Sequence, residues 1–157
     1  MKRGLLGLVP LLFILFACQK QQLEMNYYLS LLGESEIWKL TGYEIMLTSD
    51  EIKIGNGKLI MKEKNEFITD SFSFNTYAVI NGEDQRIHAG SVSGRTDIRE
   101  QTTGTLEGDE HIDFDELSDI YMIVEWWNPN ENNNDKERIN LYQKSGKDET
   151  FLNEASF

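Results

Sequence analysis

The stretch that decides the fold runs from Asp70 to Gly82 and reads DSFSFNTYAVING. One set of alternate positions holds Phe72, Phe74, Thr76 and Ala78, and the intervening set begins with two serines and an asparagine. Because successive side chains of a β-strand point to opposite faces, this alternation predicts a strand with one buried face. The strand is expected to stop at Asn81-Gly82, which is a turn signal.

The preceding residues carry the same period of two. In IWKLTGYEIMLTS (37–49) the alternating apolar positions are Trp38 and Leu40, followed by Tyr43, Ile45 and Leu47. The change of parity at Thr41-Gly42 predicts two strand halves joined by a β-bulge. In GNGKLIMKE (55–63) a turn signal precedes a further alternating run, which predicts a strand that pairs with the one before it.

The residues that follow are less uniform. Residues 83–110 alternate weakly and contain recurring glycines, so short or edge strands are expected there. DIYMIVEWW (119–127) is almost continuously apolar, which is typical of a central strand. The Asn-rich NPNENNND (128–135) and the alternating KERINLYQKSG (136–146) then predict a hairpin with a long tip.

These elements indicate an all-β fold of about seven strands. We expect residues 36–157 to form one two-layer antiparallel β-sandwich with an immunoglobulin-like topology. A small β-barrel is the alternative, because alternation does not distinguish two packed sheets from one closed sheet.

The chain begins with MKRGLLGLVPLLFILFACQKQQ, in which Lys2 and Arg3 precede an uncharged run from Gly4 to Ala17. This run has 14 residues, whereas a membrane-spanning helix needs about 20. A basic start followed by a short apolar run is the layout of a signal peptide. We therefore expect residues 1–17 to be removed on export.

The residues Leu15-Phe16-Ala17-Cys18 resemble the lipobox of bacterial lipoproteins, and the general layout resembles the small lipoproteins of Gram-positive bacteria. The resemblance implies cleavage between Ala17 and Cys18, with a diacylglyceryl group, and in some cases an N-acyl group, on Cys18. It also implies a protein anchored by this lipid to the extracytoplasmic face of the cell membrane. Cys18 is the only cysteine, which excludes an intramolecular disulfide.

Residues 18–35 are predicted to contain the lipid anchor followed by a tether or a short helix. Leu23, Tyr27 and Leu31 have the i, i+4, i+8 spacing of a helix face. Both alternatives remain open from the sequence.

The mature chain, from Cys18 onward, is strongly acidic. Two of the 15 Lys and Arg residues lie in the leader, which leaves 13 against 27 acidic residues and a net charge near −14. Such a charge disfavours nucleic acid, because phosphate binding depends on Lys and Arg. It also disfavours an anionic membrane surface, so the lipid is expected to anchor the protein without electrostatic help.

The sequence contains few residues suited to catalysis. His88 and His111 lie far apart in the sequence and have no neighbouring ligands at zinc-binding spacing. Each is therefore expected to be a structural or a surface histidine. GSVSG (90–94) has valine where a nucleophile elbow needs serine. We expect no cofactor apart from the lipid on Cys18, and no enzymatic activity.

The best metal candidates are the carboxylates of GDEHIDFDELSD (108–119). They are Asp109, Asp113, Asp115, Glu116 and Asp119. Their oxygen ligands suit calcium, but their spacing does not fit an EF-hand loop. An acidic surface loop is therefore the favoured interpretation, and no metal site is predicted.

Binding candidates come from the aromatic residues near the end of the chain. Trp126 and Trp127 are adjacent, so on a strand they must face opposite ways. An exposed tryptophan beside Tyr121 or Tyr142 could stack on a sugar ring or hold a partner's side chain. The alternative is that both tryptophans are covered.

We therefore expect a lipid-anchored binding or interaction module of the bacterial envelope, with an envelope protein or a cell-wall component as its partner. One alternative is an envelope hydrolase or calcium-dependent enzyme that uses the carboxylates between Asp109 and Asp119. Another is an accessory subunit of a membrane assembly.

Overall fold

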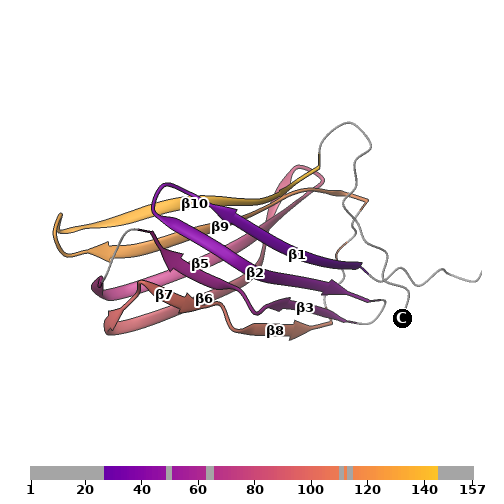
Figure 1. The fold of residues 1–157 in the computed structure, drawn as a ribbon. Coiled ribbons are helices and arrows are strands. Elements are labelled where there is room, and N and C mark those ends of the chain that lie inside the picture. The colour runs from indigo at the N-terminus through magenta and orange to yellow at the C-terminus, as the bar shows by residue number, and fades with distance from the viewer. Residues whose placement is uncertain (1–26, 49–50, 63–65, 110–111, 113–114, 145–157) are drawn as a thin grey trace, which may run out of the picture.

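The computed structural model describes residues 27–48, 51–62, 66–109, 112 and 115–144. Within these ranges the chain forms ten strands and no helix, arranged as two antiparallel sheets that pack face to face (Figure 1). The predicted two-layer β-sandwich is confirmed, and the two sheets do not close into the alternative barrel. No helix in the described ranges is long and apolar enough to cross a membrane.

Sheet A is built around its longest strand. Its members are β1 (Tyr27–Glu34), β2 (Trp38–Leu47), β3 (Ile52–Gly55), β4 (Lys58–Met61), β7 (Glu100–Thr102) and β8 (Thr105–Gly108). β1 pairs with β2, which also pairs with β4 through its first half and with β3 through its second half. β7 and β8 continue the sheet beyond β4 and β3, respectively.

Sheet B consists of long strands in the order β10, β9, β5, β6. Their bounds are β5 (Ile68–Ile80), β6 (Glu83–Asp97), β9 (Leu117–Asn128) and β10 (Asn133–Gln143). β5 and β6 are joined by Asn81 and Gly82, with φ angles of 54° and 81°. Two successive positive φ angles fit a type I′ hairpin turn, which Asn-Gly favours and which confirms the predicted stop.

Several local predictions are confirmed. Leu31 pairs with Tyr43 while Gly33 pairs with Leu40, which leaves the predicted bulge at Thr41-Gly42. β4 pairs with the first half of β2, the preceding predicted strand, although the turn signal at residues 55–57 joins β4 to the short strand β3. The continuous apolar run forms β9, which lies between β10 and β5 and is central in its sheet.

The expected tether or short helix within residues 18–35 is wrong over the described part, because Tyr27–Glu34 is strand β1. Residues spaced by four positions share a helix face, but they also share a strand face because four is a multiple of two. Leu29 and Leu31 are buried and Ser30 is exposed, so the period of two prevails. The domain therefore includes Tyr27–Glu34 and does not begin at residue 36.

The predicted topology also requires correction. In an immunoglobulin domain the third strand lies in the sheet opposite the first two, whereas β1 to β4 all pair within sheet A. The estimate of about seven strands is too low, because the described residues form ten strands, which include the short strands β3, β7 and β8. The weakly alternating middle section forms edge strands, as expected, of which β7 and β8 are short whereas β6 has 15 residues.

The core lies between the two sheets and receives the inward side chains of both. Trp38 of β2 packs against Phe72 and Trp126 of sheet B, with ring centroids 5.5 and 5.6 Å apart. All three rings are almost completely buried. This aromatic cluster supports the part of sheet B whose opposite face carries the candidate site.

Candidate functional site

The candidate site lies on the outer face of sheet B, the face turned away from sheet A. In β5 the side chains of Phe72 and Phe74 enter the core, so the serines beside them point outward. The register places Ser73 opposite Ser91 of β6 on one side and opposite Glu125 of β9 on the other. Glu125 in turn lies opposite Lys136 of β10, so one row of side chains crosses all four strands.

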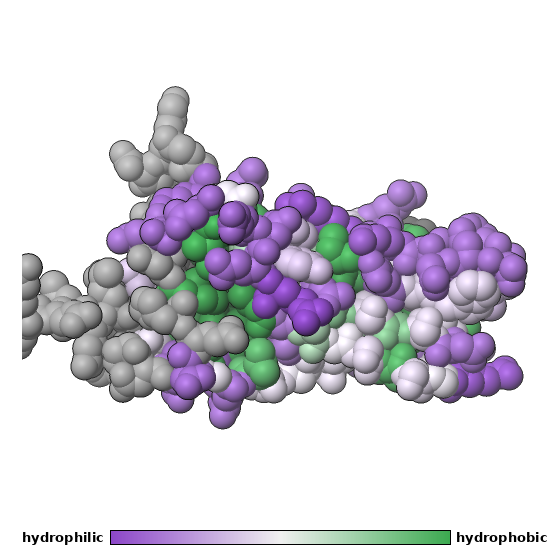
Figure 2. Space-filling model, turned by 180° about the vertical axis from the view of Figure 1, so that it is seen from behind, coloured by the Kyte–Doolittle hydropathy of each residue, from purple (hydrophilic) through white to green (hydrophobic). Residues whose placement is uncertain are grey.

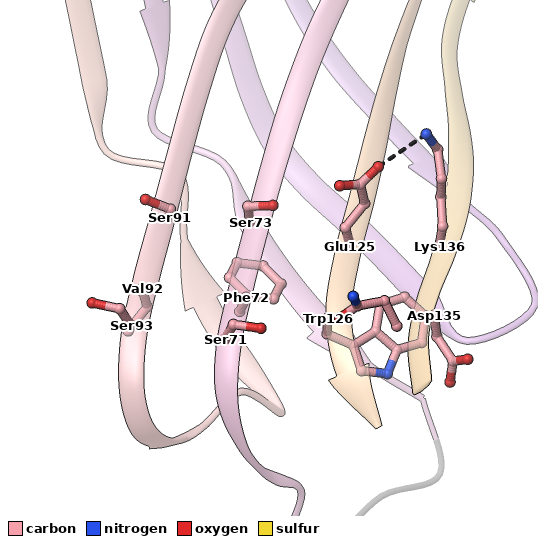
Figure 3. A pocket seen from close by; sticks show the side chains of 11 residues that line it. Ser71, Phe72, Ser73, Ser91, Val92, Ser93, Glu125, Trp126, Asp135 and Lys136 are labelled. Atoms are coloured by element: carbon pink, nitrogen blue, oxygen red, sulfur yellow. Dashed lines mark ion pairs between the residues drawn. The ribbon is translucent and has the colours of Figure 1, made fainter. Parts of the chain in front are cut away.

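A shallow trough of about 430 Å³ follows this row across the sheet (Figure 3). Its lining residues are Ser71, Phe72, Ser73, Ser91, Val92, Ser93, Glu125, Trp126, Asn134, Asp135 and Lys136. The hollow forms because short serine side chains on β5 and β6 stand beside longer side chains on β9 and β10. The trough is therefore a consequence of side-chain size and register, and no loop is needed to build it.

A second hollow of about 240 Å³ adjoins the first along β5 and β6. Ser73 and Ser91 line both hollows, while Asn75, Ala89 and Gly90 belong to the second. Gly90 is required beneath it, because a Cβ atom at this position would lie 2.4 Å from Cε1 of Phe74. The two hollows share Ser73 and Ser91 and adjoin each other over the β5–β6 hairpin.

The charged side chains of the trough are held by partners. Lys136 Nζ lies 2.9 Å from Glu125 Oε1. Asp135 lies opposite the buried Trp126, so its side chain turns to the other face of the sheet, where Asn128 Nδ2 donates a hydrogen bond of 2.7 Å to its Oδ2. The hydrogen bond and the charge of Glu125 raise the pKa of Lys136 above its usual value. Lys136 therefore remains a cation at neutral pH and is a poor general base.

An aromatic stack stands beside the trough on the same face. The rings of Tyr77 and Tyr121 are stacked with centroids 5.2 Å apart, and the guanidinium carbon of Arg138 lies 3.6 Å above the ring of Tyr121. Arg138 is fixed by a hydrogen bond of 2.8 Å from Nε to Asn140 Oδ1. Burial and hydrogen bonding to Asp84 raise the pKa of Tyr121.

The four aromatic binding candidates do not form one site. Trp126 is only 2% exposed and belongs to the core, although its backbone lines the trough. Trp127 points to the outer face and is half-buried. Tyr121 lies on the outer face but is covered by Arg138, and Tyr142 is half-buried against the core. Trp127 is the tryptophan that reaches the outer surface.

The acidic candidates are not brought together either. Asp109, Asp115 and Glu116 are exposed, whereas Asp119 is half-buried and accepts a hydrogen bond of 2.9 Å from Ser118 Oγ. Asp113 lies outside the described residues. Within the described ranges, no group of three or more His, Cys, Asp or Glu side chains is arranged to hold a metal ion.

The described histidine has a structural environment. His88 is buried between the sheets, and its Nδ1 lies 2.9 Å from the hydroxyl of Tyr43, which also donates to Thr76 Oγ1 at 3.0 Å. This arrangement agrees with the structural role expected for His88. His111, Ala17 and Cys18 lie outside the described residues.

The serines that make the trough are not among the binding residues predicted from the sequence. The available signal was the pair of segments SFS (71–73) and SVS (91–93), each with serines on alternate positions of a strand. Their meaning depends on the two segments being neighbours in register, which alternation does not reveal. Lys136 and Glu125 were likewise identifiable only as polar strand residues.

The chain matches no protein-family model, curated protein or solved structure in comparisons with known proteins. The interpretation of the site therefore depends on its own residues.

Proposed function

We propose that the chain is a lipid-anchored, extracytoplasmic binding module of the bacterial envelope. We further propose that the trough on the outer face of sheet B is the surface it presents to its partner. The observation that carries this proposal is the trough itself, which crosses four strands and presents four serine hydroxyl groups on a rigid support.

The rigid support matters because binding is weakened when a surface must first be ordered. The trough lies on paired strands of sheet B, and its backbone lies directly over the buried rings of Phe72 and Trp126. Its hydrogen-bonding groups are therefore held in place before a partner arrives. This arrangement suits binding, while the protonated Lys136 offers little basis for proton-transfer catalysis.

The proposed anchor follows from the leader and Cys18. Eight residues separate Cys18 from Tyr27, so a fully extended chain would allow the domain to begin at most about 30 Å from the lipid. Two acyl chains hold a protein firmly, since each buried methylene contributes about 0.8 kcal/mol. The module would therefore act close to the outer surface of the membrane.

The anchor is tested by metabolic labelling with a fatty acid. We expect the parent chain to be labelled and to remain in the envelope fraction. We expect the Cys18→Ser variant to be unlabelled and released from the envelope. An unlabelled parent chain, or a Cys18→Ser variant that stays on sedimented envelopes, would contradict the anchor.

The binding surface is tested separately by crosslinking in intact cells. The variant Ser73→Tyr/Ser91→Tyr fills the trough, and Ser30→Tyr adds a similar ring to the exposed face of β1 in sheet A as a control. We expect the trough variant to lose captured envelope material that the parent chain and the control retain. Equal capture by all three chains would refute the assignment of the trough.

A further inference from the structure

We infer that the ligand of the trough is an uncharged saccharide chain. This inference depends on the proposed binding function of the trough and adds the chemical class of its occupant. Shape, hydrogen bonding and charge each contribute to the argument.

The shape of the trough suits an extended chain. Its lining comes from all four strands of sheet B, and neighbouring strands lie about 4.8 Å apart, so the trough extends about 14 Å across the sheet. Figure 3 shows Ser91, Ser73, Glu125 and Lys136 in one row across the strands, with the other lining residues beside them. A linear ligand can cross this open row, whereas a small apolar molecule would find no enclosure.

The hydrogen-bonding groups suit a polyhydroxylated ligand. A serine hydroxyl both donates and accepts and rotates to match its partner, and Ser71, Ser73, Ser91 and Ser93 offer four such groups. Sugar hydroxyl groups have the same dual character. The row thus provides repeated, adaptable contacts to a chain of similar units.

A protein partner fits this surface less well. Protein interfaces concentrate their energy where an aromatic or arginine anchor fills a desolvated pocket. The apolar residues that line the trough are Phe72, Val92 and Trp126; Phe72 and Trp126 are buried in the core, and Val92 is half-buried against it. Trp127 lies on the outer face opposite Asn134 and is itself half-buried, so it does not form a deep pocket either. Figure 2, seen from behind, shows a mainly hydrophilic surface in which hydrophobic residues form separate patches.

The charges favour a neutral ligand. The charged side chains that face the trough are Glu125 and Lys136, which form an ion pair and sum to zero, and the mature chain has a net charge near −14. An acidic polymer would therefore be repelled at long range. Lys136 is also engaged by Glu125 and would have to leave that ion pair to bind an anion.

The inference is tested by calorimetric titration of the full-length chain in detergent. The probes are neutral tetrasaccharides of glucose and of N-acetylglucosamine, with an oligogalacturonate as the acidic probe. Tryptophan fluorescence is a second readout, because the half-buried Trp127 lies on the outer face opposite the trough residue Asn134. We expect a neutral chain to bind the parent and the acidic chain to bind at least tenfold more weakly.

Matched variants locate the binding. Ser73→Tyr/Ser91→Tyr should lower the affinity at least tenfold, Ser73→Ala/Ser91→Ala should lower it severalfold, and Ser30→Tyr should leave it unchanged. Thermal melting identifies variants that fail to fold. If the tyrosine double variant does not fold, the alanine double variant still tests whether the serines bind the saccharide.

Failure of every neutral probe at millimolar concentration, stronger binding of the acidic chain, or undiminished binding by both serine variants would overturn the inference. If neutral probes fail while trough-dependent crosslinking captures a protein, the saccharide inference is wrong and the proposed binding function survives. If crosslinking also proves independent of the trough, both are wrong.

Discussion

The hydroxyl group of Tyr43 joins the two sheets through the buried interior, and its removal by Tyr43→Phe tests that connection. The hydroxyl contacts Thr76 Oγ1 at 3.0 Å and His88 Nδ1 at 2.9 Å. Tyr43 and Thr76 are fully buried, and His88 is only 6% exposed. Burial raises the pKa of Tyr43, so the phenol stays neutral and remains a hydrogen-bonding group throughout the ordinary pH range.

The substitution removes one oxygen atom but leaves two buried polar groups with reduced hydrogen bonding. A buried donor or acceptor without its partner destabilises the native state by about 1 to 3 kcal/mol. Because the ring stays in place, the cavity contribution is small, and we expect Tyr43→Phe to lower the free energy of unfolding by about 2 kcal/mol. For a domain of this size the melting temperature should fall by roughly 8 °C.

Urea unfolding followed by tryptophan fluorescence measures this change, since Trp38 and Trp126 are buried in the native core. Thr76→Val provides the control in a double-mutant cycle with Tyr43→Phe. We expect the double variant to be about 1 kcal/mol more stable than additivity requires, because both substitutions remove the same contact. A loss below about 0.5 kcal/mol for Tyr43→Phe, or strict additivity, would refute the assigned network.

Three further predictions concern pH, packing and a turn. Burial lowers the pKa of His88 in the native state. Below about pH 6.5 the imidazole is therefore protonated more readily in the unfolded chain than in the native chain. The free energy of unfolding should consequently fall with decreasing pH, by up to about 1.4 kcal/mol per pH unit. Urea midpoints between pH 7 and 5 should show a shallower fall for His88→Gln, and identical profiles would contradict this. Gly90→Val should lose about 1 to 3 kcal/mol in melting experiments, because the new side chain meets the ring of Phe74, while Ala89→Val on the exposed face should change little. Glu137→Ala should lose about 1 to 2 kcal/mol in urea unfolding, since its carboxylate accepts hydrogen bonds from the Ser35 hydroxyl and the Ile37 amide, and an unchanged midpoint would exclude that role.

The strands themselves were largely predictable from the sequence, because alternation of side chains is a local property. Phe72 and Phe74 entered the core as predicted, and Asn81-Gly82 formed the expected turn. The bulge at Thr41-Gly42 was also visible as a change of parity. Segment 27–34 was ambiguous, because a spacing of four residues fits both a helix and a strand.

The candidate site was much less predictable, because it depends on pairs of residues far apart in the chain. Ser73 and Ser91 share a surface through the β5–β6 hairpin, and Glu125 joins them from β9, 52 residues after Ser73 and 34 residues after Ser91. Which of Trp126 and Trp127 faces the core follows from the register between β9 and β5. No local pattern specifies that register.

The sequence by itself determined the all-β class, the principal turns and the strong negative charge, since these depend on neighbouring residues and on composition. Only the tertiary structure decided the order of the strands, the burial of His88 and the position of the trough. The physical reason is that a period of two specifies that a strand has two different faces, but leaves open which strand lies beside it. Surface chemistry in a β-sandwich arises from that lateral pairing.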